Sequence, residues 1–213
     1  LVNVVGDGFG GLEHLNSTAL LCGRDTLPSS QSASNQITED YQTFLSLCSH
    51  EYFHTWNVKR IKPVEFVDPN LGAETYTQQL WFYEGITSYI DDWSLNQTDL
   101  IDADQYLSTI AKAIQRLLDA PGRAIQSVAT SSYDAWTKFY KQDENARNAI
   151  VSYYVKGSVI AICIDLHIRT ETNHAFTLRD VMRDYWSDFT NQTIGTHYHD
   201  FVKKVSAVIG VDI

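Results

Sequence analysis

The chain has 213 residues, 44% of them hydrophobic and 20% charged, which is the composition of a folded globular protein and argues against a largely disordered one. Its 26 acidic and 16 basic residues give a formal net charge of −10, which argues against binding to nucleic acid or to an anionic membrane surface, because both need basic patches. The three cysteines, Cys22, Cys48 and Cys163, are far apart, which argues against a disulfide framework or a cysteine zinc site.

The secondary-structure pattern changes once along the chain. Residues 1–22 alternate in polarity and contain several glycines, which predicts two strands, or a strand edge, joined by a glycine-permitted turn. Residues 23–37, rich in Gly, Pro, Ser, Gln and Asn, predict a loop. From Thr38 onward the apolar spacing is helical. Helices are predicted over residues 39–57, 77–95, 102–119, 146–169, 177–188 and 197–208, and residues 120–145 have no clear pattern.

The fold class follows from this order of elements. We expect an α+β protein in which a small N-terminal β and loop part, residues 1–37, precedes a mainly helical body, residues 38–213. Thr177 and Asp180 resemble a capping box at the start of one helix. The longest apolar run, residues 157–166, is too short to span a bilayer. The chain begins at Leu1 without an initiator methionine, so we expect a fragment or a processed piece.

A metal-binding motif lies in the predicted helix 39–57, where residues 50–54 read His-Glu-Tyr-Phe-His. His50 and His54 project from one helical face with Cβ atoms about 6 Å apart, so both imidazoles can reach one zinc ion at about 2.0–2.1 Å. Glu51 lies about 100° around the helix from His50. It can therefore sit beside the metal and take a proton from zinc-bound water. The motif alone leaves open a solvated helix face with the same residues.

A catalytic zinc site needs a third protein ligand and one open position. Residues 80–89 form an apolar, aromatic stretch in which Glu84 is the one carboxylate. A glutamate in this setting is costly to bury unless it is paired or bound to metal. Glu84 is therefore the expected third ligand, and the alternative is a partly exposed glutamate at the helix edge.

Asp91 follows Glu84 by about two helical turns and lies within about 20° of the same face. It could accept the free N–H of a ligating histidine and so fix the tautomer of that ring. Ser88 and Asp92 are weaker candidates for this role, and a solvated helix residue remains the alternative for Asp91.

Three segments, taken together and in this order, resemble the glycyl aminopeptidase family of zinc metallopeptidases. They are residues 10–14 (Gly-Gly-Leu-Glu-His), 50–60 (His-Glu-Tyr-Phe-His-Thr-Trp-Asn-Val-Lys-Arg) and 80–85 (Leu-Trp-Phe-Tyr-Glu-Gly). That family is related to the larger aminopeptidase and leukotriene hydrolase family and more remotely to thermolysin. The resemblance covers nearly the whole chain. It implies a thermolysin-like catalytic domain over residues 1–213 and the removal of N-terminal residues, with glycine and alanine preferred.

The resemblance also implies a substrate-binding segment. Glu13 matches the glutamate of the related families' Gly-x-Met-Glu-Asn motif, which binds the substrate ammonium group, and Gly10 and Gly11 would let the substrate backbone approach. The sequence departs from that motif at Leu12 and His14, so contacts between the strand edge and the substrate could differ. The alternative for Glu13 is an ordinary carboxylate at the end of a strand.

Residues 153–157, Tyr-Tyr-Val-Lys-Gly, resemble the related families' Tyr-x-Lys-Gly segment, whose tyrosine steadies the oxyanion. This places the role on Tyr154, and Tyr153 should point about 100° away from it. A phenol donor there can be worth about 3 kcal/mol. A packing tyrosine with its hydroxyl group at the surface is the alternative.

The interval between His54 and Glu84 is longer than in thermolysin-like relatives. It contains Lys59, Arg60 and Lys62 followed by Pro63, which are expected to end the first helix. A contact between Arg60 or Lys62 and a substrate carboxylate is the less favoured alternative.

The predicted protein is thus an aminopeptidase with one zinc ion, acting on peptides with a free N-terminus. The rival interpretations are a thermolysin-type endopeptidase and a non-catalytic, zinc-containing peptide-binding protein. Further domains of a full-length chain, including a PDZ-like module, are expected to lie outside these residues. The sequence favours a soluble protein and leaves its compartment open between cytoplasm and periplasm.

Overall fold

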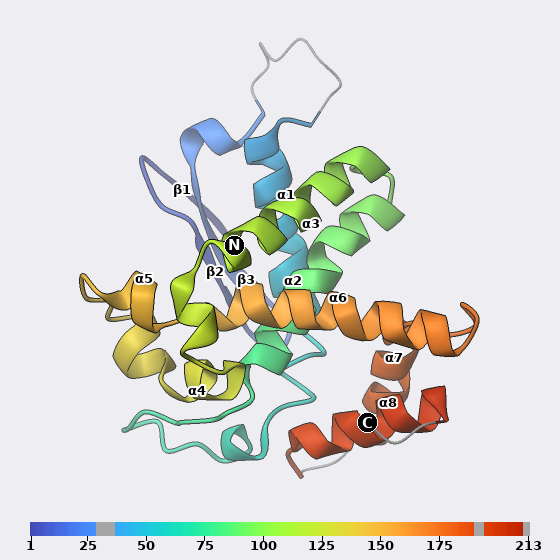
Figure 1. Ribbon diagram of the computed structural model, residues 1–213. Coiled ribbons are helices and arrows are strands. Elements are labelled where there is room, and N and C mark those ends of the chain that lie inside the picture. The colour runs from blue at the N-terminus through green and yellow to red at the C-terminus, as the bar shows by residue number, and fades with distance from the viewer. Residues whose placement is uncertain (29–36, 190–193, 211–213) are drawn as a thin grey trace.

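The N-terminal part of the protein is a three-stranded sheet in a computed structural model that describes residues 1–28, 37–189 and 194–210 (Figure 1). The strands are β1 (Val2–Val5), β2 (Gly10–Glu13) and β3 (Thr18–Gly23), arranged in the order β1-β3-β2. β1 pairs with β3 in parallel and β2 pairs with β3 antiparallel. Within the described residues β2 therefore forms one edge of the sheet.

The prediction of two strands in this part was wrong by one strand. The backbone N–H of His14 donates to the carbonyl of Ser17 over 2.8 Å, which closes a tight turn. This turn lets β2 fold back on β3 with Leu12 opposite Ala19. Residues 29–36 of the predicted 23–37 loop lie outside the described residues, and the short 3-10 helix η1 (Arg24–Thr26) precedes them.

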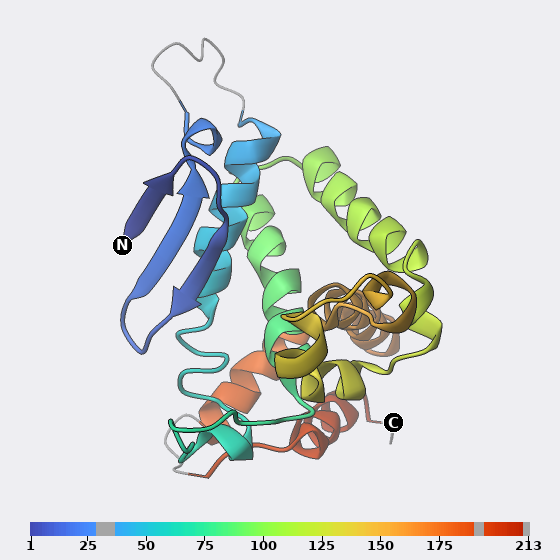
Figure 2. The same cartoon turned by 90° about the vertical axis from the view of Figure 1, so that its left-hand side faces the viewer.

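Helix α1 (Glu39–Phe53) begins where Thr38 accepts a hydrogen bond from the Tyr41 N–H through its side chain. Figure 2 shows the sheet on one side of α1. Leu20 and Cys22 of β3 pack there against Phe44 and Leu47 of α1 in a small apolar cluster. This packing holds the edge strand β2 alongside the face of α1 that carries the histidines.

Helices α2 (Leu80–Gln97) and α6 (Tyr153–Glu171) cross in the centre of the helical body (Figure 1). Gly85 and Gly157 lie at the crossing, where a Cβ on either residue would overlap the backbone of the other helix. The two backbones can therefore approach closely. The main core is formed on α2 and α6 by α7 (Leu178–Phe189) and α8 (Tyr198–Ile209), with buried side chains that include Phe82, Ile86, Ile168, Val181 and Phe201.

The predicted helix 146–169 is two helices, α5 (Ala146–Ala149) and α6. Ile150 is extended, and the Ser152 side chain then caps α6 by accepting from the Val155 N–H. The unpatterned residues 120–145 contain the 3-10 turn η3 (Pro121–Ala124), helix α4 (Val128–Tyr133) and the π-helical turn η4 (Ala135–Phe139).

The remaining elements are α3 (Ala103–Leu118) and the 3-10 turn η2 (Val64–Phe66). The Asp180 carboxylate accepts from the Thr177 N–H at the predicted start of α7. The α+β class, a small N-terminal sheet followed by a helical body, is confirmed. By length and composition the helical stretch Ala146–Glu171 could cross a membrane, but this is weak evidence because core helices of water-soluble proteins meet the same criteria.

Candidate metal centre and cleft

A cleft of about 1100 Å³ opens between the edge strand β2, the helices α1, α2 and α3, the end of η4 and the first turns of α6. The residues that the sequence singled out line this cleft: Gly10, Gly11, Glu13, His50, Glu51, His54, Glu84, Asp91 and Tyr154. They come from segments far apart in the chain, so the fold is what gathers them.

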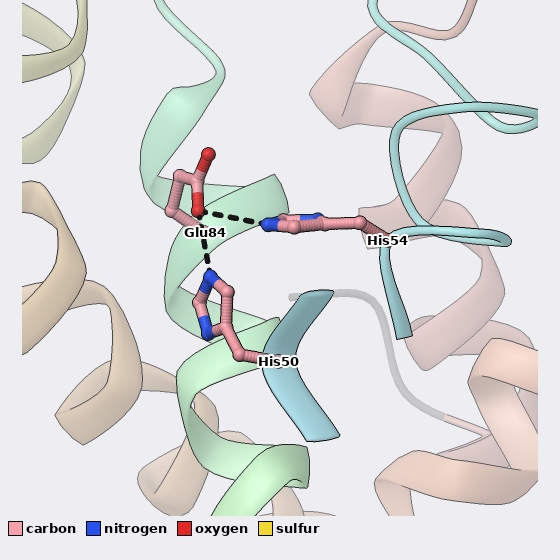
Figure 3. A group of neighbouring side chains, drawn as sticks. All are labelled: His50, His54 and Glu84. Carbon is pink, nitrogen blue, oxygen red and sulfur yellow. Dashed lines mark hydrogen bonds and ion pairs between the residues drawn. The ribbon is translucent and has the colours of Figure 1, made fainter. Parts of the chain in front are cut away.

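Two histidines and a glutamate that line the cleft converge on one another (Figure 3). His50 lies in the last turn of α1, His54 is the residue that ends this helix, and Glu84 lies in the second turn of α2. Oε2 of Glu84 lies 3.1 Å from Nε2 of His50 and 3.2 Å from Nε2 of His54. The two imidazole rings are perpendicular, with centroids 4.6 Å apart.

This donor set fits a zinc ion. Zinc ligands at about 2.0–2.1 Å and tetrahedral angles lie about 3.3 Å from one another, close to the spacing of Glu84 from each ring. Two imidazole nitrogens and one carboxylate oxygen form one of the ligand sets of catalytic zinc. His50, His54 and Glu84 are thus the residues that could hold the metal.

Each imidazole is oriented by a partner on its other nitrogen. Nδ1 of His50 lies 2.8 Å from the Asp91 carboxylate, and Nδ1 of His54 lies 2.8 Å from the backbone carbonyl of Asn57. Carboxylate and carbonyl oxygens only accept, so both Nδ1 atoms carry the proton and both Nε2 atoms face Glu84. The group that faces Nδ1 of His50 is thus the Asp91 carboxylate, two turns after Glu84 on α2.

The hydrogen bonds among these groups shift their pKa values. Burial alone would lower the pKa of His50, but its hydrogen bonds to Asp91 and Glu84 raise it to about 10. Burial alone would raise the pKa of Glu84, but hydrogen bonds from His50 and His54 lower it to about 2. At neutral pH a proton on His50 and the charge on Glu84 therefore stabilise each other in the place that a cation would take.

Glu51 is buried beside this centre, and its Oε2 has no hydrogen-bond partner among the residues that the structure describes. A Cβ on Gly11 would overlap the Glu51 carboxylate, so β2 lies directly against it. Burial raises the pKa of Glu51, while His54 and His50 oppose this rise. An unpartnered carboxylate oxygen at this place is available to a water molecule that enters the cleft.

Glu13, at the end of β2, lies close to Glu51 and His54, with one oxygen of each carboxylate and one ring nitrogen within 4.8 Å of one another. Its Oε1 also lies 3.3 Å from the Lys59 ammonium group. The sequence interpretation placed Lys59 only at the end of a helix and missed this ion pair. A carboxylate that holds one ammonium group in the cleft has the chemistry to hold another.

Tyr154 lies in the first turn of α6 with its ring centroid 6.2 Å from that of His50. The hydroxyl of Tyr153 donates to that of Tyr140 over 3.2 Å, and the hydroxyls of Tyr140 and Tyr154 are also 3.2 Å apart. The expectation that Tyr153 points away from Tyr154 was wrong, because the two rings stack with centroids 4.7 Å apart. Burial raises the pKa of Tyr154, so its hydroxyl stays a proton donor.

The weaker candidates lie elsewhere or have other partners. Ser88 lines the cleft, and Asp92 accepts a hydrogen bond from Ser46 while burial and Asp91 raise its pKa to about 7. Arg60 donates to the backbone carbonyls of Leu15 and Thr55 and so ties the β2–β3 turn to the end of α1. These contacts do not support the alternative in which Arg60 binds a substrate carboxylate.

Comparison with known proteins places this chain among the aminopeptidases. The family model of the M61 glycyl aminopeptidases matches residues 43–160, more than half of the chain. The crystal structure of an aminopeptidase N family protein from Idiomarina loihiensis is similar, with a TM-score of 0.91 and 50% sequence identity over 95% of this chain and 34% of that one. This chain thus spans about a third of the length of the solved protein. No curated protein matches it.

Proposed function

The chain belongs to the M61 glycyl aminopeptidase family, and on this premise we propose that it is the catalytic part of a zinc-dependent aminopeptidase. The substrate would be a peptide with a free N-terminus, with glycine or alanine preferred as the first residue, and the reaction would be hydrolysis of the first peptide bond. The proposal includes one zinc ion held by His50, His54 and Glu84.

One observation carries the proposal: three donor atoms from α1 and α2 converge beside a buried glutamate that has an unpartnered oxygen. The spacing of Glu84 from the two imidazole nitrogens supports a metal centre. The free Oε2 of Glu51 supports a proton acceptor next to it. A merely solvated helix face, the alternative left open by the sequence, would not bury Glu51 and His54.

Zinc bound here would act as a Lewis acid that polarises the scissile carbonyl group. Glu51 would take a proton from the attacking water and deliver it to the leaving amine, and its raised pKa suits a group that must do both. The hydroxyl of Tyr154 would donate to the carbonyl oxygen as negative charge develops on it. Tyr154 lies near enough to the centre for this role, with its ring centroid 6.2 Å from that of His50.

Glu13 would select the free N-terminus by pairing with the substrate ammonium group. Its carboxylate lies within 4.8 Å of a Glu51 oxygen and a His54 nitrogen, so it would lie about one residue away from the bond that is cut. That short distance supports removal of the first residue rather than cleavage inside a peptide. Lys59 would share Glu13 with the incoming ammonium group.

The proposal is tested by metal analysis of the full-length protein and by hydrolysis of glycyl and alanyl arylamides with and without a chelator. Glu51→Gln should keep the zinc and lose activity by about 10²–10⁴-fold, the usual contribution of a general base. Glu74→Gln is the matched control because Glu74 is exposed and does not line the cleft. Normal turnover of Glu51→Gln would refute the assigned base.

The same assay distinguishes the two rival functions. A thermolysin-type endopeptidase would cleave N-terminally blocked peptides as fast as free ones. A non-catalytic binding protein would hold zinc and peptide without any chelator-sensitive hydrolysis.

A further inference from the structure

The turn that follows α1 makes contacts that the proposed chemistry does not use. Asn57 lies in this turn, between the ligand His54 and the segment that leads away to α2, and its side chain is fully buried, with 0% exposed. It is an amide among apolar neighbours such as Val58 and Ile61. A buried amide in this position needs partners.

Asn57 joins the two elements that carry the proposed metal ligands. Its backbone carbonyl accepts from Nδ1 of His54 over 2.8 Å. Its side-chain Nδ2 donates to the backbone carbonyl of Tyr83, which directly precedes Glu84, over 3.1 Å, and to Oγ1 of Thr87 over 3.3 Å. One residue therefore contacts a ligand ring on one side and the backbone beside another ligand on the other.

Two features of this turn are unfavourable in themselves. Val58 has a φ of +142°, in a region that a β-branched side chain rarely adopts. The Oδ1 atom of Asn57 is buried and has no hydrogen-bond partner within the described part of the chain. Strained and unsatisfied groups of this kind persist where the surrounding structure holds them in place, and they gather at functional sites.

The strain at Val58 is connected to the carbonyl that contacts His54. The φ angle of Val58 and the ψ angle of Asn57 together set the plane of the peptide between them. The direction of the Asn57 carbonyl, and with it the contact to His54, therefore depends on the unusual φ of Val58. The two side-chain hydrogen bonds to α2 hold Asn57 in place while Val58 adopts this unusual φ.

We propose that Asn57 is a positioning residue of the metal centre. Its side-chain bonds to α2 fix its own carbonyl against His54, which keeps the proton on Nδ1 and turns Nε2 toward Glu84. The same bonds set the separation between His54 and Glu84. The inference rests on the proposed zinc site but assigns a role to a residue that would touch neither zinc nor substrate.

The prediction is a loss of metal affinity that exceeds any loss of stability. Partners that orient a ligating histidine typically contribute 10–100-fold to metal affinity. Asn57→Ala keeps the carbonyl but removes its anchor, so zinc should bind about 10-fold more weakly. Thr87→Val removes one of the two acceptors at nearly constant volume, and the expected weakening is smaller.

Asn96→Ala is the matched control. Asn96 also donates its Nδ2 to a backbone carbonyl, that of Ile101 over 3.2 Å, at the opposite end of α2 from Glu84. This variant should lower the melting temperature of the metal-free protein without changing its affinity for zinc. Asn57→Ala and Thr87→Val should change the affinity and, in cobalt-loaded protein, the visible absorption spectrum that reports ligand geometry.

The measurements are the zinc dissociation constant by competition with a chromophoric chelator, the cobalt spectrum and the melting temperature without metal. Wild-type affinity and spectrum in both Asn57→Ala and Thr87→Val would overturn the role of Asn57 and leave the zinc site intact. Equal loss of affinity in Asn96→Ala would also overturn it, because general destabilisation would then explain the effect. If Asn57→Ala does not fold, Thr87→Val carries the test. A wild-type protein that binds no zinc would instead overturn the proposed function.

Discussion

Zinc uptake by this protein should be strongly dependent on pH, because the metal must displace a proton from His50. Its pKa in the metal-free protein is raised from 6.5 to about 10 by Asp91 and Glu84, against the lowering effect of burial. A pH of 7.5 is therefore about 2.5 units below this pKa, and the His50 ring is almost fully protonated. The apparent affinity for zinc should then be a few hundredfold, or about 3 kcal/mol, weaker than for the deprotonated site.

The direction of this pH dependence follows from the direction of the pKa shift of His50. A raised pKa means that protonated His50 stabilises the metal-free fold fully below pH 6.5 and that this contribution is lost as the pH approaches 10. Zinc competes with that proton, so the affinity for zinc should rise about tenfold per pH unit between pH 7 and pH 9. The raised pKa of His54 acts in the same direction, whereas the lowered pKa of Glu84 leaves it charged throughout.

Calorimetric titration with zinc measures this effect. At pH 7.5, in buffers with different ionisation enthalpies, the heat of binding should vary with the buffer in proportion to at least one proton released per zinc. The Asp91→Asn variant should release fewer protons, because it removes a hydrogen bond that raises the pKa of His50. Zinc binding without proton release, at an affinity constant from pH 7 to pH 9, would refute the electrostatic argument.

Further variants test the other side chains of the cleft by steady-state kinetics. Gly11→Ala should push the Glu51 carboxylate aside and lower kcat by about 100-fold while zinc stays bound, and an unchanged kcat would contradict that contact. Tyr154→Phe should lower kcat by about 100-fold, equivalent to the ~3 kcal/mol of an oxyanion donor. Tyr140→Phe should lower kcat about fivefold, because it removes one hydrogen bond to Tyr154. It should lower kcat no further in a protein that already carries Tyr154→Phe. If the two losses were additive, Tyr140 would not act through Tyr154. Glu13→Gln should lower kcat/KM for free N-termini by about 10–100-fold and leave blocked peptides unaffected, and an equal loss for both would remove its proposed role.

The parts of the fold that repeat a pattern could be predicted from the sequence. Apolar spacing located the long helices. Their ends differ from the prediction where a single capping side chain determines the end of a helix. Ser152 caps α6 and so divides the predicted helix 146–169 in two. The short β2–β3 turn was missed because residues 14–17 contain no glycine or proline to indicate it.

The residues that would hold the metal could also be located, because helical geometry relates the members of each pair and the cost of burying an unpaired carboxylate singles out Glu84. His50 and His54 are one turn apart, and Glu84 and Asp91 are two turns apart, so each pair shares a face before any tertiary contact is known. Lys59, Tyr140 and Asn57 could not be found in this way. Their contacts depend on the path of the chain after α1 and through η4, where no period relates one residue to the next.

The contacts that pack α1 against α2 are also the contacts that form the candidate metal centre. His50 contacts Glu84 through Nε2 and Asp91 through Nδ1, two points about two turns apart on α2, while Asn57 holds α2 again beside Tyr83. Moving α2 by one residue relative to α1 would turn its face by about 100° and break all three contacts together. The register of the two helices is therefore fixed by the residues that would hold the metal and those that orient them. It follows that the site should be largely formed before zinc arrives, with the proton on His50 stabilising Glu84 until the metal displaces it.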